Sequence, residues 1–299
     1  MSNFILIFIY IGLGYFFKST SFYSQKIPNI LNKLVIYISL PAMILLQIPK
    51  LQLLGENIFP IIIAWSVMAV SALMVLIISK YFHFSKEIEG ILLLVTPLGN
   101  TSFLGIPIIQ SYYGDEALPY VLIYDQFGTF LALATYGTFV LSIYSNKTKV
   151  SATIILKKLF TFPPFIFLLV AFTLSGIKYI PVVQSILNIL SSTIVPFALI
   201  AVGLQLHLKL PAKDLRPLSS ALIIKLIFAP IFAMILCNLF NFQGEIAKIS
   251  IMEAGMAPMI TAGAMATLAG FNPRLVSAII GYGILLSFLS TYLLHTIII

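Results

Sequence analysis

Charged residues are scarce in this chain, and their scarcity decides its class. Only 9% of the 299 residues are Asp, Glu, Lys or Arg, whereas 60% are hydrophobic. A soluble domain carries roughly a quarter charged residues, because its surface must stay wet. The composition therefore excludes an ordinary soluble domain and predicts an all-α polytopic membrane protein whose main solvent is lipid.

Cysteine and histidine are also rare. The single cysteine, Cys237, excludes an internal disulfide and a cysteine-based metal cluster, and its apolar neighbours predict a buried thiol. His83, His207 and His295 lie far apart without metal-ligand spacing. The net charge of +8 is not gathered into a basic stripe with interleaved aromatic residues. We therefore predict no metal, no cofactor and no nucleic-acid partner.

Ten apolar runs are long enough, or nearly so, to cross a bilayer, which takes about 20 helical residues. Lipid forbids exposed irregular backbone, so each run is expected to be helical unless protein or water shields it. No cleavage site follows the first run, which we expect to be retained. The runs are residues 3–17, 34–48, 58–81, 88–112, 118–144, 159–177, 182–206, 218–240, 246–269 and 275–298.

The basic residues predict the orientation. With the N-terminus outside, thirteen of the 17 Lys and Arg residues fall in inside connections, three fall outside, and Lys225 lies within a run. Cytoplasmic connections carry the excess of Lys and Arg, so both termini are expected outside. We predict a multi-pass protein of the cell membrane, a bacterial inner membrane being the expected one.

The two halves of the chain repeat each other weakly but at a nearly constant offset of 155 to 158 residues. The matching positions are Leu31 and Leu187, Asn32 and Asn188, Pro41 and Pro196, Asn100 and Pro258, and Gly105 and Gly263. An odd number of helices in each half forces opposite orientations, and inverted repeats are typical of secondary transporters. We expect a first five-helix repeat over residues 1–145, a short cytoplasmic connection over 146–158, and a second, inverted repeat over 159–299.

The fourth and ninth runs are both interrupted near their middles. Residues 96–107 contain two prolines, two glycines and four polar residues, and residues 253–263 have the same character. Proline removes a backbone donor and glycine adds freedom, so both helices are expected to break there. Interrupted helices at corresponding places of two repeats indicate a transport site, and the half-helix N-termini would favour a carboxylate.

Residues 99–107 (Gly-Asn-Thr-Ser-Phe-Leu-Gly-Ile-Pro) resemble the fourth-helix motif of the auxin efflux carrier family, which lies within the bile acid/sodium symporter-like superfamily. Residues 256–258, with the small residues that follow them, are similar to that family's ninth helix. Residues 40–42, and Lys225 with Pro230, also resemble the family. The resemblance spans essentially the whole chain.

The resemblance implies ten helices, with the fourth and ninth crossing at their broken midpoints. Helices 1, 2, 6 and 7 would form a scaffold panel and the others a mobile core. It implies a permease or efflux carrier for a small organic anion, such as a carboxylate. The connection between the halves is short, which is typical of bacterial members. Substrate contacts are expected at the crossover, from Asn100, Thr101, Ser102, Pro258 and Thr261.

Three ionisable residues lie within the runs and away from their ends, where each costs about 2.5–3.5 kcal/mol on insertion scales. Glu253 is the candidate site for a coupling proton or sodium ion, or else a cap for freed N–H groups. Asp125 is a second candidate, or else a solvated or hydrogen-bonded residue nearer the outer interface. Lys225 attracts substrate, extends toward the inside, or pairs with Glu253.

The sequence lacks the motifs of the common intramembrane and hydrolytic enzymes. No His-Glu-x-x-His or Gly-x-Ser-x-Gly motif is present, and Tyr124-Asp125 lacks the Gly-x-Gly-Asp partner of an intramembrane aspartyl protease, so we expect no enzyme. A sodium-coupled symporter of the bile acid type and a non-transporting membrane sensor stay open. The oligomeric state, including a homodimer, stays open as well.

Overall fold

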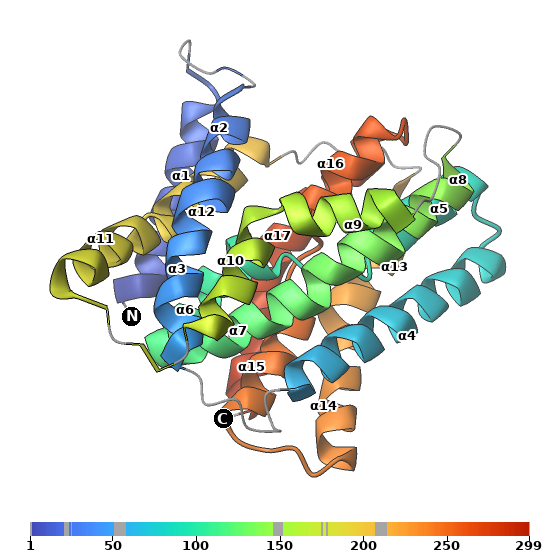
Figure 1. Ribbon diagram of the computed structural model, residues 1–299. Coiled ribbons are helices and arrows are strands. Elements are labelled where there is room, and N and C mark those ends of the chain that lie inside the picture. The colour runs from blue at the N-terminus through green and yellow to red at the C-terminus, as the bar shows by residue number, and fades with distance from the viewer. Residues whose placement is uncertain are drawn as a thin grey trace. The chain divides into compact units, whose positions relative to one another are not determined.

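The computed structural model describes residues 2–20, 24, 26–50, 58–145, 152–174, 176–177, 179–206 and 214–298. These residues are helical apart from turns and one isolated β-bridge, which confirms the all-helical class (Figure 1). The chain forms two compact units, described here one at a time. Unit 1 comprises Met1–Gly55, Ser102–Leu122 and Lys157–Leu206, and unit 2 comprises Glu56–Thr101, Ile123–Leu156 and His207–Ile299.

Unit 1 is built on the close packing of α1 (Ser2–Phe17) against α12 (Ile194–Gln205). A Cβ atom added to Gly14 would lie 2.3 Å from the carbonyl oxygen of Ile200, and one added to Gly203 would lie 2.1 Å from that of Ile11. Glycine at both positions lets the two backbones touch, as small residues do between membrane helices. The remaining elements are α2 (Lys26–Leu34), η1 (Val35–Ser39), α3 (Leu40–Gln47), η2 (Ile48–Lys50), α6 (Ile106–Tyr113), η5 (Asp115–Ala117), α7 (Leu118–Ile123), α10 (Pro163–Thr173) and α11 (Pro181–Ser192).

The four helices expected in a panel, helices 1, 2, 6 and 7, all fall in unit 1 as α1, α2 with α3, α10, and α11 with α12. Unit 1 also takes residues 102–122, which the panel was not expected to include. This division follows packing. The two sequence repeats, residues 1–145 and 159–299, stay a prediction. Residues 146–151 of the predicted connection lie outside the described residues.

Unit 2 packs α4 (Phe59–Tyr81), α14 (Ala229–Leu239) and α15 (Glu245–Ala254) around a buried apolar cluster. Cys237 belongs to this cluster, which confirms the predicted buried thiol. The other elements of unit 2 are α5 (Lys86–Val95), η6 (Tyr124–Phe130), η7 (Leu133–Gly137), α8 (Thr138–Tyr144), α13 (Leu215–Ile223), η9 (Ile224–Phe228), α16 (Ile260–Leu268) and α17 (Pro273–Ile298). Two further elements, η4 (Thr101–Gly105) and α9 (Ala152–Thr161), carry residues of both units, as does α7, whose last residue, Ile123, belongs to unit 2.

Among the described residues, six helical segments are long and apolar enough to cross a membrane: Lys26–Gln47, Phe59–Tyr81, Asp115–Tyr144, Pro181–Gln205, Leu215–Leu239 and Pro273–Ile298. Two shorter apolar helices cover Ile5–Phe17 and Pro163–Thr173. The expected fourth run is divided between α5 and α6, and the expected ninth between α15 and α16. The structure therefore describes a multi-pass membrane protein whose interrupted helices are those that the proline and glycine pattern predicts.

Candidate functional site

The two helix breaks of unit 2 meet backbone to backbone. The N–H of Asn100 donates to the carbonyl of Ala257 at 2.7 Å, and the N–H of Met259 donates to that of Leu98 at 2.9 Å. Gly99 and Pro258 thereby form an antiparallel β-bridge. Helix breaks in an apolar interior free polar backbone groups, which must find partners. Here each break satisfies the other, so the bridge holds the end of α5 against the gap between α15 and α16.

Three polar residues beside this bridge lie on π-helical segments. Thr101 is on η4, Asp125 is on η6 and Lys225 is on η9. A π turn places one more residue in the hydrogen-bonded loop than an α turn, which changes the direction of the side chains that it carries. Short π segments are frequent at functional sites, and these three mark the same region that the sequence indicates.

Asp125 is buried, with 1% of its surface exposed, and is hydrogen-bonded. The hydroxyl of Thr101 donates to Oδ1, and Nε2 of Gln126 donates to Oδ2 at 2.6 Å. The hydrogen-bonded alternative for Asp125 is confirmed, whereas the solvated position is wrong. Gln126 is a residue that the sequence reasoning missed. The signal was present, because an amide beside an acid in an apolar run needs a polar partner.

Lys225 is 2% exposed, and its ammonium group donates to the carbonyl oxygen of Ala254 at 2.9 Å. Within the described chain, no nitrogen–oxygen contact under 4.0 Å joins it to Glu253. The expected ion pair and the expected extension toward the inside are therefore both wrong. The physical reason is the end of α15, where an unpaired helix carbonyl offers the ammonium group a partner in the interior.

Glu253 is completely buried, and neither oxygen of its carboxyl group has a hydrogen-bond partner in the described part of the chain. The alternative in which it caps freed N–H groups is wrong, because neither carboxyl oxygen accepts a hydrogen bond, and the N–H groups of Asn100 and Met259 donate to carbonyls across the bridge instead. Glu253 nevertheless shares the site with charge, since Asp125 and Lys225 both act on it electrostatically. Burying a carboxyl group without hydrogen bonds costs free energy, so its presence here indicates a functional role.

The predicted substrate contacts are placed as follows. Asn100 is 1% exposed, and its Nδ2 has no hydrogen-bond partner in the described residues. Pro258 is buried in the bridge, and Thr261 is half-buried in the first turn of α16. Ser102 belongs to unit 1, where it is partly exposed. Unit 2 therefore gathers Asn100, Thr101, Pro258 and Thr261 with all three ionisable residues.

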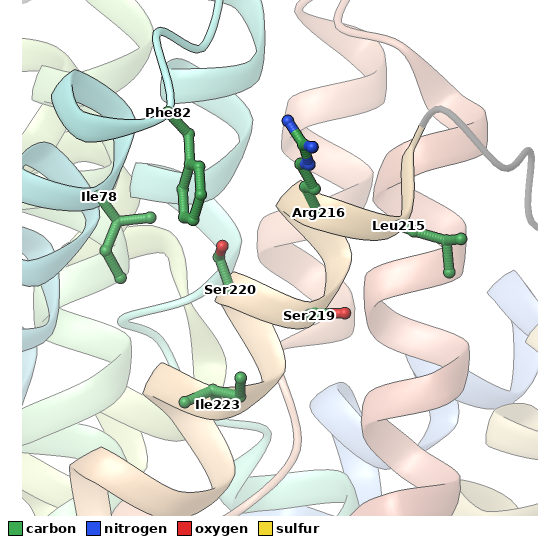
Figure 2. A pocket seen from close by; sticks show the side chains of 7 residues that line it. All are labelled: Ile78, Phe82, Leu215, Arg216, Ser219, Ser220 and Ile223. Carbon is green, nitrogen blue, oxygen red and sulfur yellow. The ribbon is translucent and has the colours of Figure 1, made fainter.

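A cavity of about 330 Å³ lies elsewhere in unit 2, between the end of α4 and the start of α13. Figure 2 shows Phe82 and Ile78 directed toward α13, with the guanidinium of Arg216 at one end of the space. The other lining residues are Leu215, Ser219, Ser220 and Ile223. None of the predicted site residues lines this cavity, which no sequence pattern indicates.

The comparison with known families decides the class. The family model described as membrane transport protein matches residues 1–295. The chain belongs to this family. The match confirms the auxin efflux carrier resemblance that residues 99–107 carry.

Two curated relatives are similar to this transporter along nearly its whole length. An uncharacterized transporter of Methanocaldococcus jannaschii is 31% identical over 283 residues, covering 92% of this chain and 91% of the relative. An uncharacterized transporter of Methanothermobacter thermautotrophicus is 25% identical over 289 residues, covering 95% of this chain and 93% of the relative. This transporter is thus similar throughout to proteins described as transporters, which supports a transport function over an enzymatic one.

Proposed function

We propose that this protein is a secondary transporter for a small organic anion, such as a carboxylate, which binds at the bridge between the two helix breaks. The observation that carries the proposal is the side chain of Asn100, a buried amide whose Nδ2 has no hydrogen-bond partner in the described residues. A buried donor without a partner is costly unless a ligand completes it. An oxygen of a carboxylate would do so.

The start of α16 supports an anion at the same place. Met259, just before α16, supplies no side-chain cap for the helix. Its own N–H group donates a hydrogen bond to the carbonyl oxygen of Leu98. The next N–H groups, those of Ile260 and Thr261, open the helix, and helix N-termini attract anions. Backbone pairing at Gly99 and Pro258 brings this terminus beside Asn100. The amide, the first turn of α16 and the Thr261 hydroxyl would together bind the anion.

The proposed transport mechanism is alternating access between the two sides of the cell membrane. It rests on ten crossing segments in two inverted repeats with both termini outside. The six long helices, the two shorter apolar helices and the two interrupted pairs are compatible with that number. The site would be exposed to each side in turn as one part of the protein moves against the other.

The proposal is tested by binding and uptake with Asn100→Ala. Small carboxylates, including malate, malonate and an indole acid, are screened by thermal shift on the purified protein, since a ligand of the folded state raises apparent stability. Removing a donor to a charged acceptor costs about 1.5–3 kcal/mol, or roughly ten- to a hundredfold in affinity. We expect Asn100→Ala to lose the shift and to abolish uptake, while still inserting into the membrane.

The matched control is Asn238→Ala, which removes an exposed amide from α14 of the same unit. It should keep both the shift and the uptake. Equal shifts in the two variants would place the anion elsewhere. A wild-type protein that binds a carboxylate but moves none of it into vesicles would instead identify a sensor.

A further inference from the structure

The carbonyl groups at the end of α15 are already occupied. The last four carbonyls of a helix have no partner within it. Here those of Ile251 and Met252 accept from the N–H of Gly255, and that of Glu253 accepts from the N–H of Met256. The fourth, that of Ala254, accepts from the ammonium group of Lys225. The negative end of α15 is thus satisfied by the chain itself.

The two carbonyl oxygens of the bridge are also committed. The carbonyls of Leu98 and Ala257 accept the two hydrogen bonds of the bridge. Residues 255–257 are Gly, Met and Ala, which carry no side-chain oxygen. A hard cation such as sodium needs a cage of several oxygen ligands, as calcium and magnesium do. Among the described residues, the buried side-chain oxygens of this region without a hydrogen-bond partner are those of the Glu253 carboxyl group, Oε1 of Gln126 and Oγ1 of Thr96, and the ammonium group of Lys225 occupies the last carbonyl of α15.

The ammonium group is packed tightly against the bridge. A Cβ atom added to Gly99 would lie 3.1 Å from Nζ of Lys225 and 3.5 Å from the backbone oxygen of Glu253. Glycine at this position therefore leaves the room that the ammonium group occupies. The lysine reaches the middle of the site from η9 and is held there by packing and by one hydrogen bond.

The charges around Glu253 balance in one protonation state. Lys225 carries one positive charge, and Asp125, which accepts hydrogen bonds from Thr101 and Gln126, suits the ionised form. With Glu253 protonated, this buried cluster is neutral. With Glu253 ionised, it carries an excess negative charge in a medium of low dielectric, which is unfavourable. Among the described residues no group donates a hydrogen bond to the Glu253 carboxyl group, which agrees with the protonated form.

Other titratable groups around α15 leave this balance unchanged. Tyr124 of η6 is buried and acts on Glu253, and Cys237 of α14 acts on Tyr124, but both are neutral in their ordinary states. On α17, which also packs on α15, His295 is influenced by the charge of Lys248 near the start of α15. The exchangeable charge is that of Glu253.

We infer that the Lys225 ammonium group is a resident cation of this site and takes the place that a sodium ion would otherwise fill. The ion coupled to transport is then a proton, which the carboxyl group of Glu253 carries. The coupling role rests on the proposed transport function. An ionised Glu253 would repel a carboxylate at the neighbouring Asn100, so anion and proton bind together. The proton is taken up from water on one side and released to water on the other, with the anion.

The first experiment tests the resident cation without any substrate. The thermal stability of the purified full-length protein is compared in sodium chloride and choline chloride at equal ionic strength, for the wild type, Lys225→Met, Lys225→Arg and the exposed control Lys80→Met. We expect a sodium-dependent rise in midpoint temperature only in Lys225→Met, where the site has lost its cation. A rise in the wild type, or none in Lys225→Met, would overturn the assignment. If Lys225→Met does not fold, Lys225→Gln replaces it.

The second experiment tests the proton. Infrared spectra over a pH series detect the carbonyl stretch of a protonated carboxyl group, which should weaken as the pH rises. We expect this band in the wild type and in the control Glu245→Gln, which changes an exposed acid of the same helix, and its loss in Glu253→Gln. A band that survives in Glu253→Gln, or is missing from the wild type throughout the series, contradicts the inference. Both experiments are independent of the anion, so failure of the proposed function would appear in the Asn100→Ala test alone.

Discussion

At the scale of single residues, the shape of the site depends on glycine packed against proline. A Cβ atom added to Gly283 of α17 would lie 2.4 Å from Cδ of Pro258, whose ring is rigid. Gly283→Ala should therefore destabilise the protein by about 1–3 kcal/mol, the usual cost of overpacking, and weaken anion binding by displacing the bridge.

The measurement is the midpoint of thermal unfolding together with the ligand-induced shift. The control is Gly12→Ala on α1, where a Cβ atom meets nothing within 4 Å. That variant should be neutral or more stable, because alanine favours a helix by about 1 kcal/mol over glycine. If Gly283→Ala matches Gly12→Ala in both readouts, Pro258 is not held by this contact.

Residue identity predicted which side chains matter, but not whom they contact. The cost of charge in lipid singles out Asp125, Lys225 and Glu253, and all three are buried in unit 2. The ion pair and the helix cap expected from sequence spacing are both wrong. Lys225 instead uses a helix carbonyl, which every residue type possesses and which no sequence pattern marks. Hydrogen-bond partners of this kind are set by tertiary packing.

At the scale of secondary-structure elements, Tyr144 of α8 contacts α5 through a hydrogen bond and through close packing. The hydroxyl of Tyr144 donates to Glu89 at 2.7 Å, and a Cβ atom at Gly90 would lie 2.7 Å from Cβ of Tyr144. Tyr144→Phe keeps the packing and removes the hydrogen bond, so it should cost about 1 kcal/mol, or up to about 3 kcal/mol since the acceptor is charged.

Thermal unfolding in detergent measures this cost. Tyr81→Phe is the control, because Tyr81 is 75% exposed at the end of α4. Identical midpoints for the two variants would mean that Glu89 is satisfied by Lys86 alone, to which it is bonded at 2.7 Å.

The helix breaks were predictable and the π-helical segments were not. Proline and glycine act on the backbone locally, so the sequence of residues 96–107 and 253–263 predicts that the helices are interrupted there. Whether a turn is α or π depends on a difference of one residue in the hydrogen-bonded loop, which apolar sequence hardly influences. Thus the sequences of η6 and η9, which carry Asp125 and Lys225, contain no pattern that distinguishes a π turn from an α turn.

At the scale of the whole molecule, hydropathy predicts more crossings than helix length alone supports. The shorter apolar helices, Ile5–Phe17 and Pro163–Thr173, and the divided fourth and ninth runs fall short of the length of an uninterrupted span. A bilayer core is about 30 Å thick and takes about 20 helical residues. The predicted number of ten therefore depends on two halves of a broken helix crossing together, which labelling from each side can decide.

The distribution of Lys and Arg residues predicts which connections between the helices face the outside of the cell. With Cys237 replaced by Ala, single cysteines are introduced at four exposed positions: Glu116 and Gln243, expected outside, and Lys80 and Arg274, expected inside. A membrane-impermeant maleimide applied to intact cells should label only the first two, and all four should react after permeabilisation. The positive-inside distribution is the physical reason. Labelling of only Lys80 and Arg274 would show that the orientation is the reverse of the predicted one, with both termini inside. Labelling at one position of each pair would show that the number of crossings between the two positions differs from the predicted number.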